Sequence, residues 1–492
     1  MIATHLPILQ VVLPLLAAPV CALLRRGTLA WLLALIVSWG ALLIAGLLLN
    51  QVLTGGILSY AIGSWPAPWG IEYRVDPVNA FVLLIVAGTG AVVLIFAKAS
   101  VEREVAADQQ ALFYTAYLLC LTGLLGITIT GDAFNVFVFL EISSLSSYAL
   151  ISMGKDRRAL VAAYQYLIMG TIGATFILIG IGLLYAMTGT LNMEDLARRI
   201  PLVAETRTVR AAFAFLTVGI SLKLALFPLH LWLPNAYTYA PSAVTAFLAA
   251  TATKVAVYLL LRFLFTIFGA GFSFSLMRLD LILLPLALVG IFSTSLVAIF
   301  QSDIKRMLAY SSVGQIGYMI LAISLASVTG LAAGIVHLFN HALMKGTLFL
   351  ALGCVVYRIG STEIERMAGL GRRMPWTMAS FVIGGLSLIG VPLTVGFISK
   401  WYLILGALER GWWPVAVLIL ITSLLAVIYI GRVVEAAYFR TVPKGLETVR
   451  EAPLSLLVPT WILTAANLYF GIDASLTTGV AFRAAELLLG TA

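Results

Sequence analysis

The sequence predicts an all-α membrane protein of about 14 transmembrane helices, on two observations. The first is composition: 62% of the 492 residues are hydrophobic and only 10% are charged, whereas soluble proteins carry about a quarter charged residues. The second is a series of apolar runs of about 18 residues or more, the length at which a helix crosses a bilayer. These runs are continuously apolar rather than alternating, which favours helices over a β-barrel.

The predicted spans follow one another with short polar connections. They are 6–24, 28–52, 76–98, 110–129, 132–153, 159–189, 209–239, 242–266, 279–301, 306–326, 330–357, 376–408, 412–437 and 454–474. The first span is expected to be a retained helix, because Arg25 and Arg26 follow its apolar run instead of preceding it. The short polar segment Met193–Ile200 is expected to lie at the membrane surface.

Two of the long spans contain residues that interrupt a helix. Pro228, His230 and Pro234 fall inside 209–239, and Gly390 and Pro392 fall inside 376–408. Membrane helices tolerate proline only where neighbours or water satisfy the freed backbone groups. Broken helices at corresponding positions of two halves predict an internal repeat with its transport site at the breaks.

The breaks divide the chain into four predicted parts. These are three N-terminal helices (1–109), a first repeat (110–266), a second repeat (267–437) and a C-terminal loop and helix (438–492). If both termini lie outside the cytoplasm, most Lys and Arg residues of the connections lie inside, as the positive-inside rule requires. The prediction is therefore a multi-pass protein of the cell inner (plasma) membrane with both termini outside.

Five ionisable residues lie deep in apolar runs, where charges are rare. They are Glu141, Lys223, Lys254, Lys345 and Lys400. A charge at the bilayer centre costs at least about 2.5–3.5 kcal/mol, so several of them together indicate a function. Glu141 has serine and tyrosine side chains at i+3 and i+7 on its own helix face, which makes that face polar.

Two histidines extend this set. His337, His341 and Lys345 are spaced i, i+4 and i+8 and share one helix face. Imidazole titrates near neutral pH, which suits a proton relay. Each broken helix also carries one lysine near its break, Lys223 in the first and Lys400 in the second.

These residue types permit a specific mechanism. A lysine in a low-dielectric setting releases its proton more readily, and a nearby carboxylate makes it hold the proton. A row of Glu, Lys and His could therefore pass protons laterally and release them to either side. The alternative to this hypothesis is that these residues have purely structural roles. Lys345 could extend to the surface, and the histidines or Glu141 could be helix–helix hydrogen-bond partners. Asp132 and Asp303 are expected to be helix N-caps.

Four segments carry a resemblance to a known family. They are LKLALFPLHLWLPNAYTYAPSAVTAFLAATATKVAVYLL (222–260), SDIKRMLAYSSVGQIGYM (302–319), HLFNHALMKGTLFLALG (337–353) and LSLIGVPLTVGFISKW (386–401). They resemble the antiporter-like membrane subunits of respiratory complex I and of Mrp-type cation/proton antiporters. The resemblance covers about 75–440 and implies 14 helices with two inverted five-helix repeats.

The stretch GDAFNVFVFLEISSLSSYALI (131–151) resembles the D-type component of Mrp antiporters and its relatives in membrane-bound hydrogenases. Complex I subunits often have a proline a few residues after the glutamate, where this chain has serines. The resemblance implies that Glu141 pairs with Lys223, that Lys254 is the central relay, and that Lys400 is the terminal exchange lysine. His337 and His341 would connect the last two.

The sequence thus predicts a proton-translocating subunit of a multi-subunit Na⁺/H⁺ antiporter, with other Mrp-type subunits as partners and with no cofactor or metal of its own. The alternative is a proton-pumping subunit of a redox complex, either complex I-like or a hydrogenase, in which partners supply the chemistry. A non-transporting scaffold is a third interpretation, and it predicts that the buried lysines tolerate leucine.

Overall fold

The computed structural model describes residues 2–491, and helices dominate this part of the chain. The α-helices are α1 (Leu6–Leu24), α2 (Gly27–Gly55), α3 (Pro77–Glu104), α4 (Gln110–Ile129), α5 (Ala133–Ser152), α6 (Arg158–Thr188), α7 (Met193–Val203), α8 (Arg207–Leu224), α9 (Trp232–Tyr239), α10 (Ser242–Ala250), α11 (Ala252–Leu261), α12 (Asp280–Ile299), α13 (Ile304–Ser324), α14 (Val328–Ile359), α15 (Leu370–Arg373), α16 (Pro375–Ile389), α17 (Val395–Glu409), α18 (Trp413–Phe439), α19 (Leu454–Ile472) and α20 (Ser475–Leu489).

The remaining regular elements are short. Two π-helical segments follow α11, Arg262–Ile267 and Gly271–Leu276. An antiparallel hairpin of β1 (Leu58–Ala61) and β2 (Glu72–Val75) joins α2 to α3. Short 3₁₀ helices occupy Ile2–His5, Ile62–Ser64, Ala107–Gln109 and Ile364–Met367.

The count of spans agrees with the prediction of an all-α membrane protein. In the described part of the chain, 12 helices are long and apolar enough to cross a membrane. Two further apolar segments are each divided in two, α8 with α9 and α16 with α17. Counting each divided pair as one crossing gives the number expected from the sequence.

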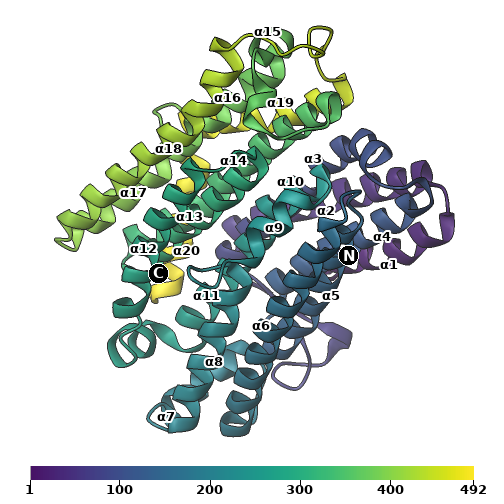
Figure 1. Cartoon of the computed structure of the whole chain (residues 1–492). Helices are drawn as coiled ribbons and strands as arrows, with labels where there is room; N and C mark the ends of the chain where they lie inside the picture. Colours follow the sequence, from purple (N-terminus) through teal and green to yellow (C-terminus); the bar gives the residue numbers. More distant parts are fainter. Residues whose placement is uncertain (1, 492) are drawn as a thin grey trace.

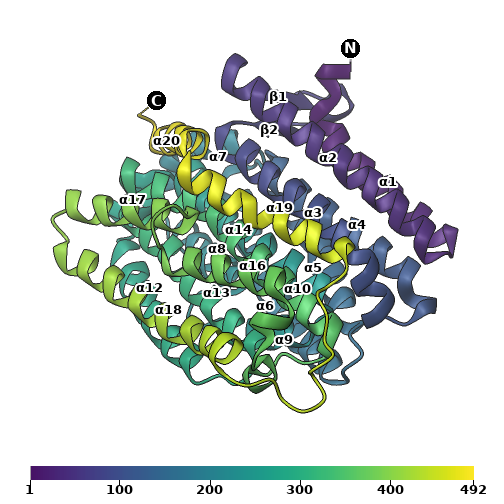
Figure 2. The same ribbon diagram turned by 90° about the horizontal axis from the view of Figure 1, so that it is seen from above.

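The helices form one bundle in which the two predicted repeats lie side by side (Figure 1). α14 runs through its interior and contacts α10, α13, α16, α17, α19 and α20. From above, α19 lies along α3 and α14, and α1 and α2 form an outer edge (Figure 2). Because α14 is enclosed by protein, polar side chains in its centre are shielded from lipid.

Both expected N-caps are confirmed. Asp132 accepts a hydrogen bond from the Asn135 amide at 2.7 Å, and Asp303 accepts one from the Arg306 amide at 2.8 Å. The surface segment predicted at Met193–Ile200 is the first part of α7. Lys305, which fits the positive-inside pattern, is buried and donates to the Ala240 carbonyl at 2.9 Å.

Three features were not expected from the sequence. The span predicted at 242–266 is interrupted at Thr251, which has φ −123° and ψ −59°. α20 follows the last predicted span, and the β-hairpin fills the connection after α2. Thr251 has no proline or glycine beside it, so local sequence gives no warning of the interruption.

Candidate functional site

The first break separates α8 from α9 at the turn that contains Pro228 and His230. α8 ends in a left-handed cap at Ala225, which has φ +60°, and the Trp232 indole donates to the Leu222 carbonyl at 3.0 Å across the turn. His230 is buried, and its Nδ1 has no hydrogen-bond partner in the described chain. Pro234 lies in the first turn of α9. The break thus leaves the C-terminal carbonyls of α8 next to a lysine in the last turn.

That lysine is Lys223, and it points toward α5. Its Nζ donates to Ser144 Oγ at 2.9 Å, and its side chain is buried. Glu141 lies one turn earlier on α5 and interacts electrostatically with Lys223. The expected Glu141–Lys223 ion pair is not among the direct ion pairs of residues 2–491, and the direct hydrogen bond of Lys223 there goes to Ser144. Glu141 Oε1 is buried without a hydrogen-bond partner there.

A small cavity connects Lys223 to the next helix of the site. It has a volume of about 30 Å³ and is bounded by Lys223, Ser144 and Tyr166 on one side and by Ala252 and Val255 on the other. A volume of this size holds about one water molecule. The cavity therefore places space for one water between Lys223 and α11, whose side chains at this wall are apolar.

Lys254 stands on α11, just after the interruption at Thr251. Its side chain is fully buried, and its Nζ donates to the Ala249 carbonyl at the end of α10 and to Thr253 Oγ1 at 3.4 Å. The interruption leaves carbonyls at the α10 end without helical partners, and a cation there is favoured by the helix dipole. Lys254 thus sits at a helix end although the sequence showed one continuous span.

The three residues predicted to share a face of α14 do so in the structure. Lys345 donates to the Leu308 carbonyl at 2.8 Å and to the Ser311 hydroxyl of α13. The rings of His341 and His337 are stacked, with centroids 5.9 Å apart and planes 4° from parallel. Lys254 interacts electrostatically with His341 and Lys345. α11 and α14 therefore form one continuous set of nitrogen bases.

The second break ends this set. α16 ends at Gly390 in a left-handed conformation with φ +93°, and α17 begins after the turn that contains Pro392. Lys400 reaches back from α17 and donates to the Leu388 and Ile389 carbonyls at 3.1 and 2.8 Å, and to Ser423 Oγ at 3.0 Å. Its ammonium therefore caps the end of α16.

His337 connects α14 to the second break. Its Nδ1 lies 2.8 Å from Ser399 Oγ, the hydroxyl that precedes Lys400 in the sequence. Tyr318 of α13 packs beside both residues, with its ring 5.2 Å from Lys400 Nζ and 6.0 Å from the His337 ring. The predicted residues from Glu141 to Lys400 thus line up across five helices, while His230 and the prolines shape the breaks.

Several polar atoms in this row lack fixed partners. Both ring nitrogens of His341 and Nε2 of His337 are buried without a hydrogen-bond partner in the described chain. Buried polar groups are almost always satisfied, so such atoms are suited to transient hydrogen bonds. A base with a free lone pair can accept a proton from a neighbour and pass it on.

The sequence did not single out the residues that support the row. Ser311, Ser399 and Ser423 place hydroxyls against the lysines and histidines of the second half. Gly170 of α6 allows close packing, since a side chain there would collide with the Tyr148 hydroxyl and lie 3.5 Å from Lys223 Nζ. Hydroxyls and glycines are frequent in membrane helices, so their composition alone marks no site.

Comparison with known proteins identifies the family. Residues 130–426 match the family described as NADH:quinone oxidoreductase/Mrp antiporter, TM. The chain is 42% identical to NADH-quinone oxidoreductase subunit N of Desulforudis audaxviator, over 95% of this chain and 96% of that one. It is 30% identical to the D component of the Na(+)/H(+) antiporter of Alkalihalophilus pseudofirmus, over 92% of this chain and 90% of that one.

A solved structure supports the same family assignment. One chain of the membrane-bound sulfane sulfur reductase, an archaeal respiratory membrane complex, superposes with a TM-score of 0.90 at 33% identity, over 99% of this chain and 98% of that one. The family resemblance predicted from the sequence motifs is therefore confirmed. The chain is an antiporter-like membrane subunit and belongs to the NADH:quinone oxidoreductase/Mrp antiporter transmembrane family.

Proposed function

We propose that this chain is the proton-translocating subunit of a hetero-oligomeric complex of the cell membrane, and that protons pass laterally along the row from Glu141 to Lys400. The observation that carries the proposal is the continuity of the row. Each lysine donates to a hydroxyl or to a helix-end carbonyl, and buried histidine nitrogens that have no hydrogen-bond partner among residues 2–491 lie between Lys345 and Lys400. A scaffold would not need these charges.

Two kinds of complex could use such a row. A redox-driven complex is supported by the identity of 42% to an NADH-quinone oxidoreductase subunit and of 33% to a chain of a respiratory complex. Exchange of sodium for protons, which the sequence motifs favoured, is supported by the identity of 30% to a Na(+)/H(+) antiporter component. Apart from Glu141, the row consists of nitrogen bases and hydroxyls, which bind protons, so we place the redox-driven complex first.

The test begins with the complex purified from native membranes and the identification of its co-purifying subunits. Proton translocation is then measured with a pH-sensitive dye in reconstituted vesicles. The Lys254→Leu variant should assemble and lose proton translocation. Lys98→Leu is the matched control, because Lys98 also lies on a membrane helix but packs over the Trp31 ring, away from the row.

An assembled Lys254→Leu complex that translocates protons at the wild-type rate would overturn the proposal. The kind of complex is decided by the same preparation. Redox subunits and proton translocation driven by electron transfer support the first assignment. Uptake of radioactive sodium driven by a proton gradient supports the second.

A further inference from the structure

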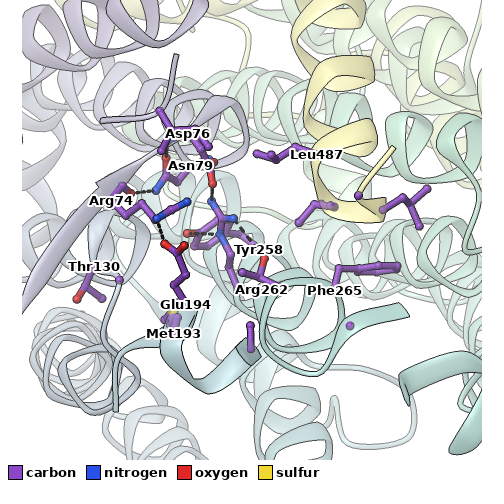
Figure 3. A pocket seen from close by; sticks show the side chains of 18 of the residues that line it. Arg74, Asp76, Asn79, Thr130, Met193, Glu194, Tyr258, Arg262, Phe265 and Leu487 are labelled. Carbon is purple, nitrogen blue, oxygen red and sulfur yellow. Dashed lines mark hydrogen bonds and ion pairs between the residues drawn. The ribbon is translucent and has the colours of Figure 1, made fainter. Parts of the chain in front are cut away.

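A cavity of about 330 Å³, lined by both charged and apolar side chains, lies at the end of the bundle that the charge bias places outside. It is bounded by α3, α7, the hairpin strand β2 and the π-helical segment that follows α11 (Figure 3). The charged side chains that face it are Glu72, Arg74, Asp76, Glu194 and Arg262. None of these residues belongs to the row from Glu141 to Lys400.

The inner wall of this cavity is a buried ion pair. Arg262 Nη2 donates to both carboxylate oxygens of Asp76 at 2.6 Å, and the two side chains are 7% and 4% exposed. Asp76 also caps α3, because its Oδ1 accepts from the Val78 and Asn79 amides at 2.9 and 3.1 Å. The pair thus joins the start of α3 to the end of α11.

The same helix carries the central lysine of the row. Lys254, Tyr258 and Arg262 are spaced i, i+4 and i+8, so they follow one face of α11 over about 12 Å. Arg262 Nε donates to the Tyr258 hydroxyl at 2.9 Å, and that hydroxyl donates to the Thr128 carbonyl at 2.8 Å. Hydrogen-bonded polar groups therefore continue from Tyr258, one turn beyond Lys254, to the cavity.

A change of helix type marks the position of Arg262. α11 passes into a π-helix at this residue, and π-helical turns are frequent at functional sites. The next polar residue, Thr266, lines the cavity and accepts from Arg262 Nη1 at 3.4 Å. The π-helical turn therefore holds the guanidinium between the phenol and the carboxylate.

We propose that Tyr258, Arg262 and Asp76 form an outer branch of the relay, through which Lys254 exchanges protons with the cavity. This inference rests on the proposed function. The Lys254 ammonium gives up a proton, and the Tyr258 oxygen receives one and passes its own into the cavity, which Tyr258 and Asp76 both line. The Asp76 carboxylate accepts the proton there. Arg262 stays protonated throughout. The protonated Asp76 then yields the proton to the cavity, where Glu72 and Glu194 are the next carboxylates.

The first test changes the branch without removing its packing. Tyr258→Phe deletes one hydroxyl. Asp76→Asn combined with Arg262→Gln removes both charges together and keeps an oxygen at the α3 cap. In the assembled complex, both variants should lower proton translocation about 100-fold or more, the scale of a lost proton-transfer group. The control is Asp195→Asn with Arg199→Gln, an ion pair of α7 with an N–O distance of 2.9 Å that does not line the cavity.

The second test asks whether the cavity carries the protons. Thr266→Cys places a thiol on its wall, and the native cysteines Cys21, Cys120 and Cys354 are buried. A membrane-impermeant, cationic thiol reagent should block translocation when added on the cavity side and should have no effect from the opposite side. Confirmed labelling of Thr266→Cys with an unchanged rate would overturn the outer branch.

The outcomes separate this inference from the proposed function. If Lys254→Leu keeps the wild-type rate, the relay itself is wrong. If Lys254→Leu is inactive while Tyr258→Phe and the neutral double variant keep the wild-type rate, only the outer branch is wrong. A purely structural ion pair would give the second result.

Discussion

The two broken helices hold their lysines in different ways. At the first break, Lys223 projects from the last turn of α8 to a neighbouring helix, where Ser144 accepts its hydrogen bond and Glu141 lies one turn away. At the second break, Lys400 returns to its own broken helix and donates to two carbonyls at the end of α16. At the first break a carboxylate compensates the positive charge of the lysine, and at the second break the carbonyls of a helix end do so.

This difference indicates different roles for the two ends of the row in the proposed relay. A carboxylate can move or take up a proton, so the charge that stabilises Lys223 can be switched. Helix-end carbonyls carry only a fixed partial charge, so the environment of Lys400 is constant. We infer that the first break controls the row and that the second break releases or receives its protons.

The largest expected effect comes from removing either terminal lysine. Lys223→Leu and Lys400→Leu should each abolish proton translocation in the reconstituted complex, because each removes a terminal group of the row. Translocation is measured with a pH-sensitive dye after confirming assembly. Wild-type rates in either assembled variant would remove that end from the pathway.

A smaller effect is expected from removing the serine hydroxyls that accept hydrogen bonds from the two lysines. Ser144→Ala removes the only direct hydrogen-bond acceptor of Lys223 within residues 2–491, whereas Ser423→Ala leaves Lys400 with two carbonyls. The Ser144→Ala variant should therefore lose translocation several-fold, and Ser423→Ala should lose less. Equal losses would contradict the distinction between the two breaks.

Substitutions at the left-handed caps of the two broken helices should change the free energy of unfolding in opposite directions. Gly390 has φ +93°, and a Cβ there would lie 3.0 Å from Lys400 Cδ. Gly390→Ala should destabilise the protein by about 1–2 kcal/mol from left-handed strain alone. The thermal unfolding midpoint of the purified complex measures this, and an unchanged midpoint would show that the turn adapts.

The smallest expected effect is at the other cap. Ala225 adopts φ +60° although it is not glycine, so Ala225→Gly relieves strain while adding freedom to the unfolded chain. These two terms, about 1–2 and 0.4–1 kcal/mol, leave a net stabilisation of about 0–1.6 kcal/mol. The same thermal measurement checks it. A lower midpoint would mean that the alanine side chain contributes packing that outweighs its strain.

Most of the fold and of the row was predictable from the sequence. Long apolar runs fix the spans, and a buried lysine is conspicuous because its placement in lipid is costly. The helix face that joins His337 to Lys345 follows from spacing alone. The interruption at Thr251 was not predictable, since alanines flank it and neither a proline nor a glycine adjoins it. The cavity near Asp76 was also missed, because an acidic residue just before a helix is commonly an N-cap and does not by itself indicate a cavity.

The interior position of α14 has a consequence for dynamics. Its segment from Gly330 to Val355 is buried throughout, so its amides can exchange with solvent only when much of the bundle opens. Hydrogen–deuterium exchange should therefore be slowest around His337–Lys345 and faster in α1 and α2, which are less enclosed. With such a rigid backbone, the proposed relay would proceed along α14 by rotations of side chains on a stationary helix.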